Sequence, residues 1–191
     1  MLALNGSPRG EHGNTAQALR RTGADVIHLA TYDGTVAALR QRIKAAPALI
    51  IGSGVYWSSW GSPLQRFLEV MTSEEASDTF MGKPLGVILT MDSVGGSDVA
   101  ARLTGVFTLW GCVIPPFSTV ILSRAAQADE DVWHPEDIDI LVRNLRGPPY
   151  TAWPIKRLRA VEGPYPHSGI LDLGSPPLPL TEGTNGQPAP R

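Results

Sequence analysis

The feature that most constrains this fold is one continuously apolar stretch, "ALIIGSG" over Ala48–Gly54. A strand with one solvated face alternates apolar and polar residues, and this stretch lacks that alternation. Such a strand is covered on both faces, as in a parallel sheet whose crossover helices lie on either side. Four other segments also have the pattern of short strands. They span Leu2–Gly6, Ala24–Ala30, Pro84–Met91 and Cys112–Leu122.

A helix-like segment follows each predicted strand. Asn14 is expected to cap the first helix, which ends at Gly23. Asp33 is expected to cap the second helix, and Pro63 opens the third. The last two helices are predicted at Val99–Gly111 and His134–Arg146. Because strands and helices alternate throughout, the sequence predicts an α/β fold with a five-stranded parallel sheet and helices on both faces, in three layers.

The composition changes towards the end of the chain. The 191 residues are enough for one domain with an extension. After Gly147 the sequence is dense in proline and glycine, and no helical or strand period persists. We therefore expect a folded domain over residues 1–147 and a partly disordered C-terminal extension over residues 148–191.

Charge and cysteine content exclude several classes of function. The net charge is −2 and no basic run occurs, so neither nucleic acid nor a membrane is an expected partner. No apolar run approaches the ~20 residues of a membrane span. The single cysteine, Cys112, is expected to be buried and inert, and no histidine pair has metal-ligand spacing. We expect a cytoplasmic protein without a metal site.

The loop after the first strand, "NGSPRGEHGNT", is a candidate anion site. Ser7, Asn14 and Thr15 offer side-chain donors, and the helix beginning near Asn14 offers free N–H groups. Arg9 adds one positive charge. The loop lacks the lysine-bearing pattern of a triphosphate site, so a single phosphate group is the expected ligand. The alternative is that this stretch is only a surface turn.

Two further loops follow predicted strands at the same edge of the sheet. The loop "SGVYWSSWGS" carries Tyr56, Trp57 and Trp60, which suit a flat ligand or instead pack on neighbouring helices. The loop "DSVGGSD" contains Gly95 and Gly96, which permit close approach of a ligand or form a flexible connection. The aspartates that bound this loop, Asp92 and Asp98, are expected to cap the next helix.

The three loops together resemble the NADPH-dependent FMN reductase family, which has a flavodoxin-like fold. The resemblance rests on "GSPRGEHGNT", "VYWSSWGSPLQRFLE" and "GKPLGVILTMDSVGGSDVAARLTGVFTLWGC", in order and register over residues 2 to about 122. The chain departs from the family in three ways. It has Gly54 where proline is common in the family, it has Gln65 where lysine is common, and its first helix is short.

The resemblance implies a set of cofactor-binding residues. Ser7, Arg9, Asn14 and Thr15 match the family's FMN phosphate loop. The second loop matches the segment that borders the isoalloxazine, and the third matches the loop on the other side of the flavin. The residues of these two loops are Val55, Tyr56, Trp57, Gly95 and Gly96. No protein side chain is expected to act as a catalytic acid or base.

The resemblance also implies an activity. NADPH or NADH would pass a hydride to bound FMN, which would then reduce a small-molecule acceptor such as a free flavin, a quinone or an azo compound. Family members are commonly dimers or tetramers, so a homodimer or homotetramer is expected. Two alternatives stay open: a flavodoxin-type electron carrier, which usually has a strongly acidic face, and a flavin-free binding or scaffold protein.

Overall fold

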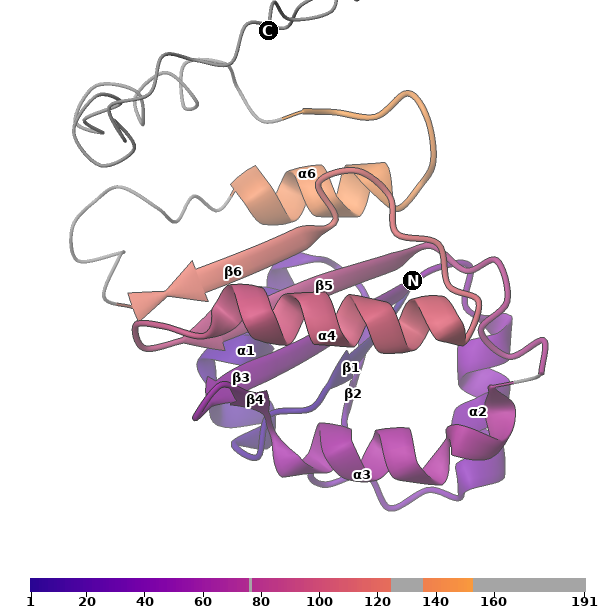
Figure 1. The fold of residues 1–191 in the computed structure, drawn as a ribbon. Helices are drawn as coiled ribbons and strands as arrows, with labels where there is room; N and C mark the ends of the chain where they lie inside the picture. Colours follow the sequence, from indigo (N-terminus) through magenta and orange to yellow (C-terminus); the bar gives the residue numbers. More distant parts are fainter. Residues whose placement is uncertain (76, 125–135, 153–191) are drawn as a thin grey trace, which may run out of the picture. The chain divides into compact units, whose positions relative to one another are not determined.

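The computed structural model describes residues 1–75, 77–124 and 136–152. Within these residues, five strands form a parallel sheet in the order β2-β1-β3-β5-β6 (Figure 1). The strands are β1 (Leu2–Asn5), β2 (Asp25–His28), β3 (Leu49–Tyr56), β5 (Leu85–Met91) and β6 (Thr119–Ser123). A sixth strand, β4 (Ser59–Trp60), pairs antiparallel with the end of β3. The predicted parallel sheet of a flavodoxin-like α/β fold is confirmed, with β4 as an addition.

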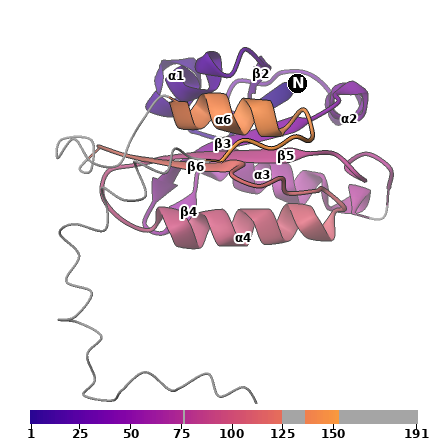
Figure 2. The same ribbon diagram turned by 90° about the horizontal axis from the view of Figure 1, so that it is seen from above.

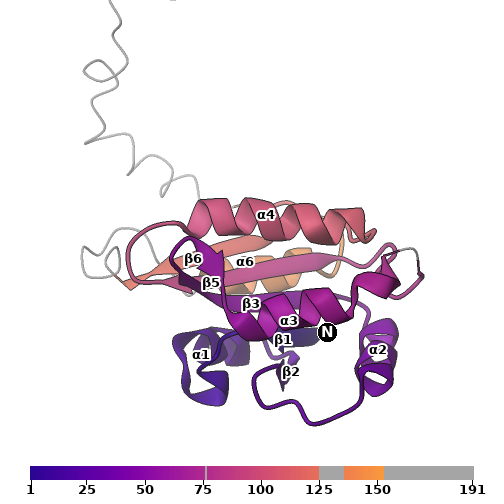
Figure 3. The same cartoon turned by 60° about the horizontal axis from the view of Figure 1, so that its bottom comes forward.

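Helices cover both faces of the sheet. Figure 2 shows α1 and α6 on one face and α3 and α4 on the other. In Figure 3, α3 and α4 lie in front of the strands and α6 lies behind them. The five α-helices of the described residues are α1 (Asn14–Arg21), α2 (Val36–Ala45), α3 (Ser62–Val70), α4 (Gly96–Leu109) and α6 (Glu136–Asn144). Two short 3-10 helices are η1 (Gly10–His12) and η2 (Thr72–Glu74).

Two hydrophobic clusters explain why the first half of the central strand is apolar on both faces. Ile50 belongs to the cluster on the α1 and α6 side, together with Leu19 and Leu141. Ile51 belongs to the larger cluster, which includes Leu39 of α2 and residues of α3 and α4. Both isoleucines are fully buried. A side chain of this size contributes about 1.5–3 kcal/mol when it is removed from water, so a polar residue on either face of β3 would be costly.

The last strand is shorter than predicted. The expected strand over Cys112–Leu122 begins only at Thr119. Ahead of it, Val113 forms an isolated bridge with Pro84. Pro115 and Pro116 have no N–H to donate to a ladder, so pairing cannot continue through them. As expected for a segment interrupted by prolines, β6 is an edge strand of the sheet.

The caps of the first two helices also differ from prediction. Gly13, not Asn14, is the N-cap of α1, and no side chain caps that helix. The hydroxyl group of Thr35, not the carboxylate of Asp33, caps α2 by accepting a hydrogen bond from the amide of Ala38 at 3.1 Å. The first helix begins one residue earlier than expected and the second begins two residues later. Asn14 and Asp33 therefore do not occupy the N-cap positions.

The end of the described chain is tied to the domain. Asn144 accepts a hydrogen bond from the amide of Thr151 at 2.7 Å and donates one to its carbonyl at 2.9 Å. Most of the predicted extension over residues 148–191 lies outside the described residues, as does its expected disorder. No helix in the described ranges is long and apolar enough to cross a membrane.

Candidate functional site

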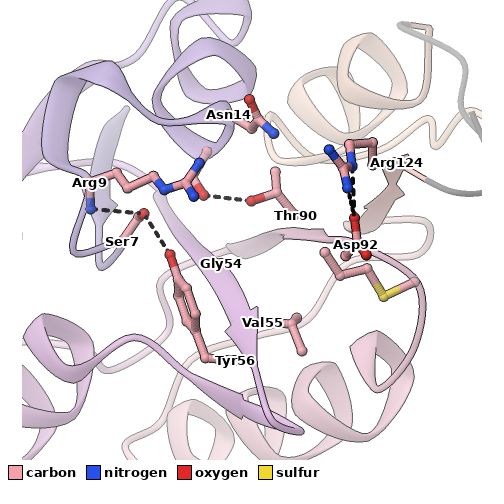
Figure 4. Close-up of a pocket in the computed structure, with 11 residues that line it drawn as sticks. Ser7, Arg9, Asn14, Gly54, Val55, Tyr56, Thr90, Asp92 and Arg124 are labelled. Carbon is pink, nitrogen blue, oxygen red and sulfur yellow. Dashed lines mark hydrogen bonds and ion pairs between the residues drawn. The ribbon is translucent and has the colours of Figure 1, made fainter.

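A cavity of about 370 Å³ opens at the carboxyl ends of the parallel strands (Figure 4). This is where ligands bind in open α/β sheets, and the volume is within the range of small-molecule pockets. Six of the nine residues predicted for cofactor binding line it. They are Ser7, Arg9, Asn14, Thr15, Val55 and Tyr56. The sheet topology therefore brings the first and second predicted loops to one site.

The loop after β1 is held in a compact turn. The amide of Gly10 donates to the carbonyl of Ser7 at 3.0 Å, and the amide of Arg9 approaches the Ser7 hydroxyl at 3.4 Å. Gly6 is needed for packing and not for a left-handed turn, because a Cβ there would lie 2.4 Å from the Cβ of Leu64. The loop thus sits directly against α3 and presents Ser7 and Arg9 to the cavity.

The start of α1 supplies free donors beside this loop. With Gly13 as an uncapped N-cap, the amides of Asn14, Thr15 and Ala16 have no partner within the helix. Asn14 occupies the first helical position, and its side chain lines the cavity instead of capping the helix. A helix start with free N–H groups and a partial positive charge favours an anion. Arg9 adds a full positive charge on the same wall.

Thr15 is oriented by a contact that the sequence did not reveal. Its hydroxyl lies 2.7 Å from the hydroxyl of Thr90, near the end of β5. Thr15 is 1% exposed, so this pair joins α1 to the sheet at the wall of the cavity. One hydroxyl of such a pair donates and the other accepts, which leaves the pair one free proton and three lone pairs for other partners.

The end of β3 forms the opposite wall. Tyr56 points its hydroxyl across the cavity towards Ser7, and the two oxygens lie 3.5 Å apart (Figure 4). At that distance the contact is weak. Gly54 and Val55 precede Tyr56 along the same wall. The tyrosine ring thus spans the space between the two loops.

Trp57, predicted beside Val55 and Tyr56, does not line this cavity. It occupies the turn between β3 and β4 with φ 50°, Ser58 follows with φ 58°, and Trp57 is fully exposed. Arg102 of α4 holds this turn by donating to the Ser58 carbonyl, and its guanidinium lies 5.1 Å from the ring centroid of Trp60. A positive φ at a bulky residue is rare, so the clamp stabilises an unfavourable conformation.

Gly95 and Gly96 also lie outside the cavity lining. Gly95 is the N-cap of α4 with φ 91°, and a Cβ there would lie 2.9 Å from the hydroxyl of Ser58. A Cβ at Gly96 would lie 2.5 Å from Ile121. Both glycines are therefore required for the close approach of α4 to its neighbours. The predicted cap by Asp98 is wrong, because this residue lies in the first turn and pairs with Arg102 at 3.1 Å.

Five lining residues were not predicted from the sequence. Asp92, expected to cap α4, instead pairs with Arg124 at 2.6 Å on the cavity rim. Their position along the chain could have identified them, because they lie at or just after the carboxyl ends of strands, at the edge of the sheet where the ligand was expected. The five are Gly54, Thr90, Met91, Asp92 and Arg124.

Cys112 takes no part in the site. It is buried, as predicted, and burial raises the pKa of its thiol to about 12. The thiol stays protonated at neutral pH and is a poor nucleophile. Among the described residues, no group of three or more His, Cys, Asp or Glu side chains could hold a metal ion.

Several solved structures share this fold. RosB, solved with 8-demethyl-8-formylriboflavin-5'-phosphate, is 15% identical, with a TM-score of 0.59 over 100% of this chain and 98% of that one. The apo form of the NADH:FMN oxidoreductase EMOB is 19% identical, with a TM-score of 0.56 over 82% and 92% of the two chains. The NAD(P)H:(acceptor) oxidoreductase FerB from Paracoccus denitrificans is 16% identical, with a TM-score of 0.56 over 76% and 96%.

These identities are low enough that the structures show a shared fold alone. No curated protein matches the chain. The family match comes from the sequence itself, over residues 1–127, which is most of the described domain and includes every predicted site residue. The chain belongs to the NADPH-dependent FMN reductase family.

Proposed function

We propose that this protein binds FMN in the cavity and acts as an NAD(P)H-dependent oxidoreductase. The observation that carries the proposal is that Arg9 and Asn14, from the loop after β1, meet Tyr56 from the end of β3 around one cavity at the uncapped start of α1. Family membership is the reason for choosing FMN as the ligand, and the chemistry of the cavity lining suits FMN.

The lining residues fit the two ends of a flavin mononucleotide. Arg9, Asn14 and the free amides of α1 suit a phosphate, because they combine positive charge with several N–H donors. The ring end needs a flat, less polar surface, which Val55, Tyr56 and Met91 provide. Ser7 and Thr15 lie on the phosphate side and add hydroxyl groups.

Bound FMN would supply the hydride chemistry between a nicotinamide and an electron acceptor. The protein's own residues bind and orient the cofactor. Arg9 would offset part of the phosphate charge, and the Thr15–Thr90 pair joins α1 to the sheet at the cavity wall. Tyr56 closes the side opposite the helix start. No side chain needs to act as an acid or base in this scheme.

The electron donor in the proposal is NADPH or NADH, and the acceptor is a small planar molecule such as a free flavin or a quinone. Trp57 supports the acceptor class, because it is fully exposed in the turn directly after the cavity-lining residue Tyr56. Aromatic rings favour stacking on flat ligands. A homodimer or homotetramer belongs to the same proposal, since large exposed apolar side chains are typical of interaction surfaces.

Absorbance spectroscopy tests the proposal directly. The purified protein is dialysed, its spectrum is recorded with and without added FMN, and NADPH or NADH is then added without oxygen. A bound-flavin spectrum that bleaches supports the oxidoreductase and identifies its donor. A bound flavin that neither nucleotide bleaches points to an electron carrier. Failure to retain flavin at saturating FMN overturns the proposal and favours a flavin-free binding protein.

A further inference from the structure

We propose that Asn5 and His28 are positioning residues that set the shape of the loop over Ser7–Gly10 and thereby its preference for a phosphate. Neither residue lines the cavity. The inference rests on the proposed function for the phosphate preference of the loop and for FMN as a probe. Its structural part, a fixed histidine tautomer beside Asn5, stands apart from any ligand.

Asn5 is the last residue of β1, is 0% exposed and uses both the nitrogen and the oxygen of its amide group. Its Nδ2 donates to the carbonyl of Gly10 at 2.8 Å and contacts Nδ1 of His28 at 2.9 Å. Its Oδ1 accepts from the amide of Ser7 at 3.0 Å. One side chain therefore joins both ends of the loop to the neighbouring strand.

These partners allow only one orientation of the Asn5 amide. If the amide were flipped, Oδ1 would face the carbonyl oxygen of Gly10 and Nδ2 would face the amide of Ser7. Each contact would then set two acceptors or two donors against each other. Because these groups are buried, the mismatch would leave polar atoms unsatisfied.

The fixed amide in turn fixes the tautomer of His28. An amide nitrogen only donates, so Nδ1 of His28 must accept and the ring proton must be on Nε2. His28 lies in β2, opposite Asn5 in the register of the parallel pair. β2 therefore supplies the one acceptor that completes the hydrogen bonding of Asn5.

The loop geometry depends on this arrangement. Gly10 has φ 53° and is buried, and its amide also closes the turn onto Ser7. Without the Asn5 bridge, the turn keeps only its own short hydrogen bonds. Ser7 and Arg9 would then sample other positions, and the phosphate site would lose its preorganisation. The flavin ring, which needs the β3 wall, would be affected much less.

A comparison of FMN with riboflavin tests the proposal, because the two ligands differ only by the phosphate. Asn5→Ala and His28→Leu should weaken FMN binding about tenfold while riboflavin binding stays within about twofold of the wild type. His28→Asn places an oxygen acceptor near the position of Nδ1 and should restore the FMN preference. His28→Gln places its acceptor one bond further out and should not.

His12→Leu is the matched control, since His12 belongs to the same loop region, its side chain is 86% exposed and it does not line the cavity. This variant should bind both ligands as the wild type does. Thermal unfolding confirms that each variant is folded. Equal loss of FMN and riboflavin, or no loss of either, would overturn the positioning role.

Nitrogen-15 NMR of the histidine rings tests the same idea without flavin. His28 of the wild type should be in the Nε2–H tautomer, and Asn5→Ala should change its ring shifts. A wild-type His28 with its proton on Nδ1 would refute the inference even if FMN binds. If the wild type binds no flavin, the proposed function fails, whereas an Nε2–H tautomer that depends on Asn5 still supports the bridge.

Discussion

The ring of Tyr56 lies over Gly54, so closely that a Cβ on residue 54 would come within 2.8 Å of it. Gly54 pairs with Thr90 in the sheet, so its backbone has little freedom to move away. From this position Tyr56 reaches towards Ser7 on the far wall. The absence of a side chain at residue 54 thus decides where the tyrosine sits in the cavity.

We predict that Gly54→Ala displaces the Tyr56 ring and weakens FMN binding by about tenfold, or ~1.4 kcal/mol. The reason is steric, since the ring and the new methyl group would occupy the same space. Fluorescence titration with FMN measures the effect. In a Tyr56→Leu background the same change should cost much less, because the two residues are in contact and their effects are not additive. Additive losses would contradict this explanation.

Removing a phosphate-side group should weaken FMN binding without unfolding the protein. Arg9→Ala and Asn14→Ala are each expected to cost about 1–3 kcal/mol, the range for charge-assisted or buried hydrogen bonds. Equilibrium dialysis with FMN gives the affinities. Arg66→Ala is the matched control, because Arg66 is exposed on α3 and does not line the cavity. Unchanged FMN affinity in both variants would disprove the phosphate assignment.

The turn that carries Trp57 should depend on Arg102. Arg102→Ala removes a hydrogen bond to the Ser58 carbonyl and the contact with the Trp60 ring, for an expected loss of about 1–2 kcal/mol in stability. Denaturant unfolding measures it. Arg102→Lys keeps the charge near Asp98 but lacks the planar group, so its stability should lie between that of the wild type and that of Arg102→Ala. Equal stability of all three proteins would show that the clamp contributes nothing.

Glu74 should make stability depend on acid. Its side chain is 8% exposed and accepts hydrogen bonds from Thr79 at 2.8 Å and Ser77 at 3.0 Å, with Arg40 at 2.8 Å. The Thr79 bond is the main reason that the pKa of Glu74 lies below its ordinary value, with contributions from Ser77 and Arg40. The folded state therefore favours the ionised carboxylate.

It follows that Glu74 stabilises the fold above the ordinary pKa of a glutamate, and that this contribution is lost as the pH falls through its lowered pKa. Glu74→Gln should melt below the wild type at neutral pH. The gap should narrow as the pH falls from neutral through the lowered pKa of Glu74, below which both proteins carry an uncharged group at this position. Melting temperatures across this range give the result, and a gap that widens in acid would reverse the sign of the argument.

Cys112 should resist alkylation in the folded protein. Burial both blocks access and keeps the thiol protonated, with its pKa raised to about 12. Iodoacetamide at neutral pH should modify it only after denaturation, as followed by intact mass. Rapid modification of the native protein would show that the region around Cys112 opens.

Much of the architecture could be predicted from local patterns. The apolar run at Ala48–Gly54 requires cover on both faces, and the structure places buried clusters on both sides of β3. The position of the site followed from the rule that strand ends meet at one edge. Helix caps were harder, and the predicted cap at Asn14 was wrong because one residue of offset in the incoming chain decides which side chain can turn back.

The two residues by which this chain departs from the family, Gly54 and Gln65, also have structural consequences that the sequence did not show. Gly54 gives the Tyr56 ring its place. Gln65, where lysine is common, accepts a hydrogen bond from the indole of Trp60 at 2.8 Å and donates to Glu69 at 2.9 Å. A lysine could not accept from the indole, so Gln65 helps to fix the hairpin that carries Trp57.

The sequence by itself determined the α/β class, the alternation of strands and helices along the chain, and the loops that form the site. These features depend on periodicity and composition. Only the tertiary structure decided which side chains enter the cavity. Tyr56 faces the cavity and Trp57 faces away from it at a turn where Trp57 and Ser58 both have a positive φ, and Arg102 of α4 holds this turn through the Ser58 carbonyl. The Asn5–His28 contact likewise joins residues 23 positions apart, which no local pattern encodes.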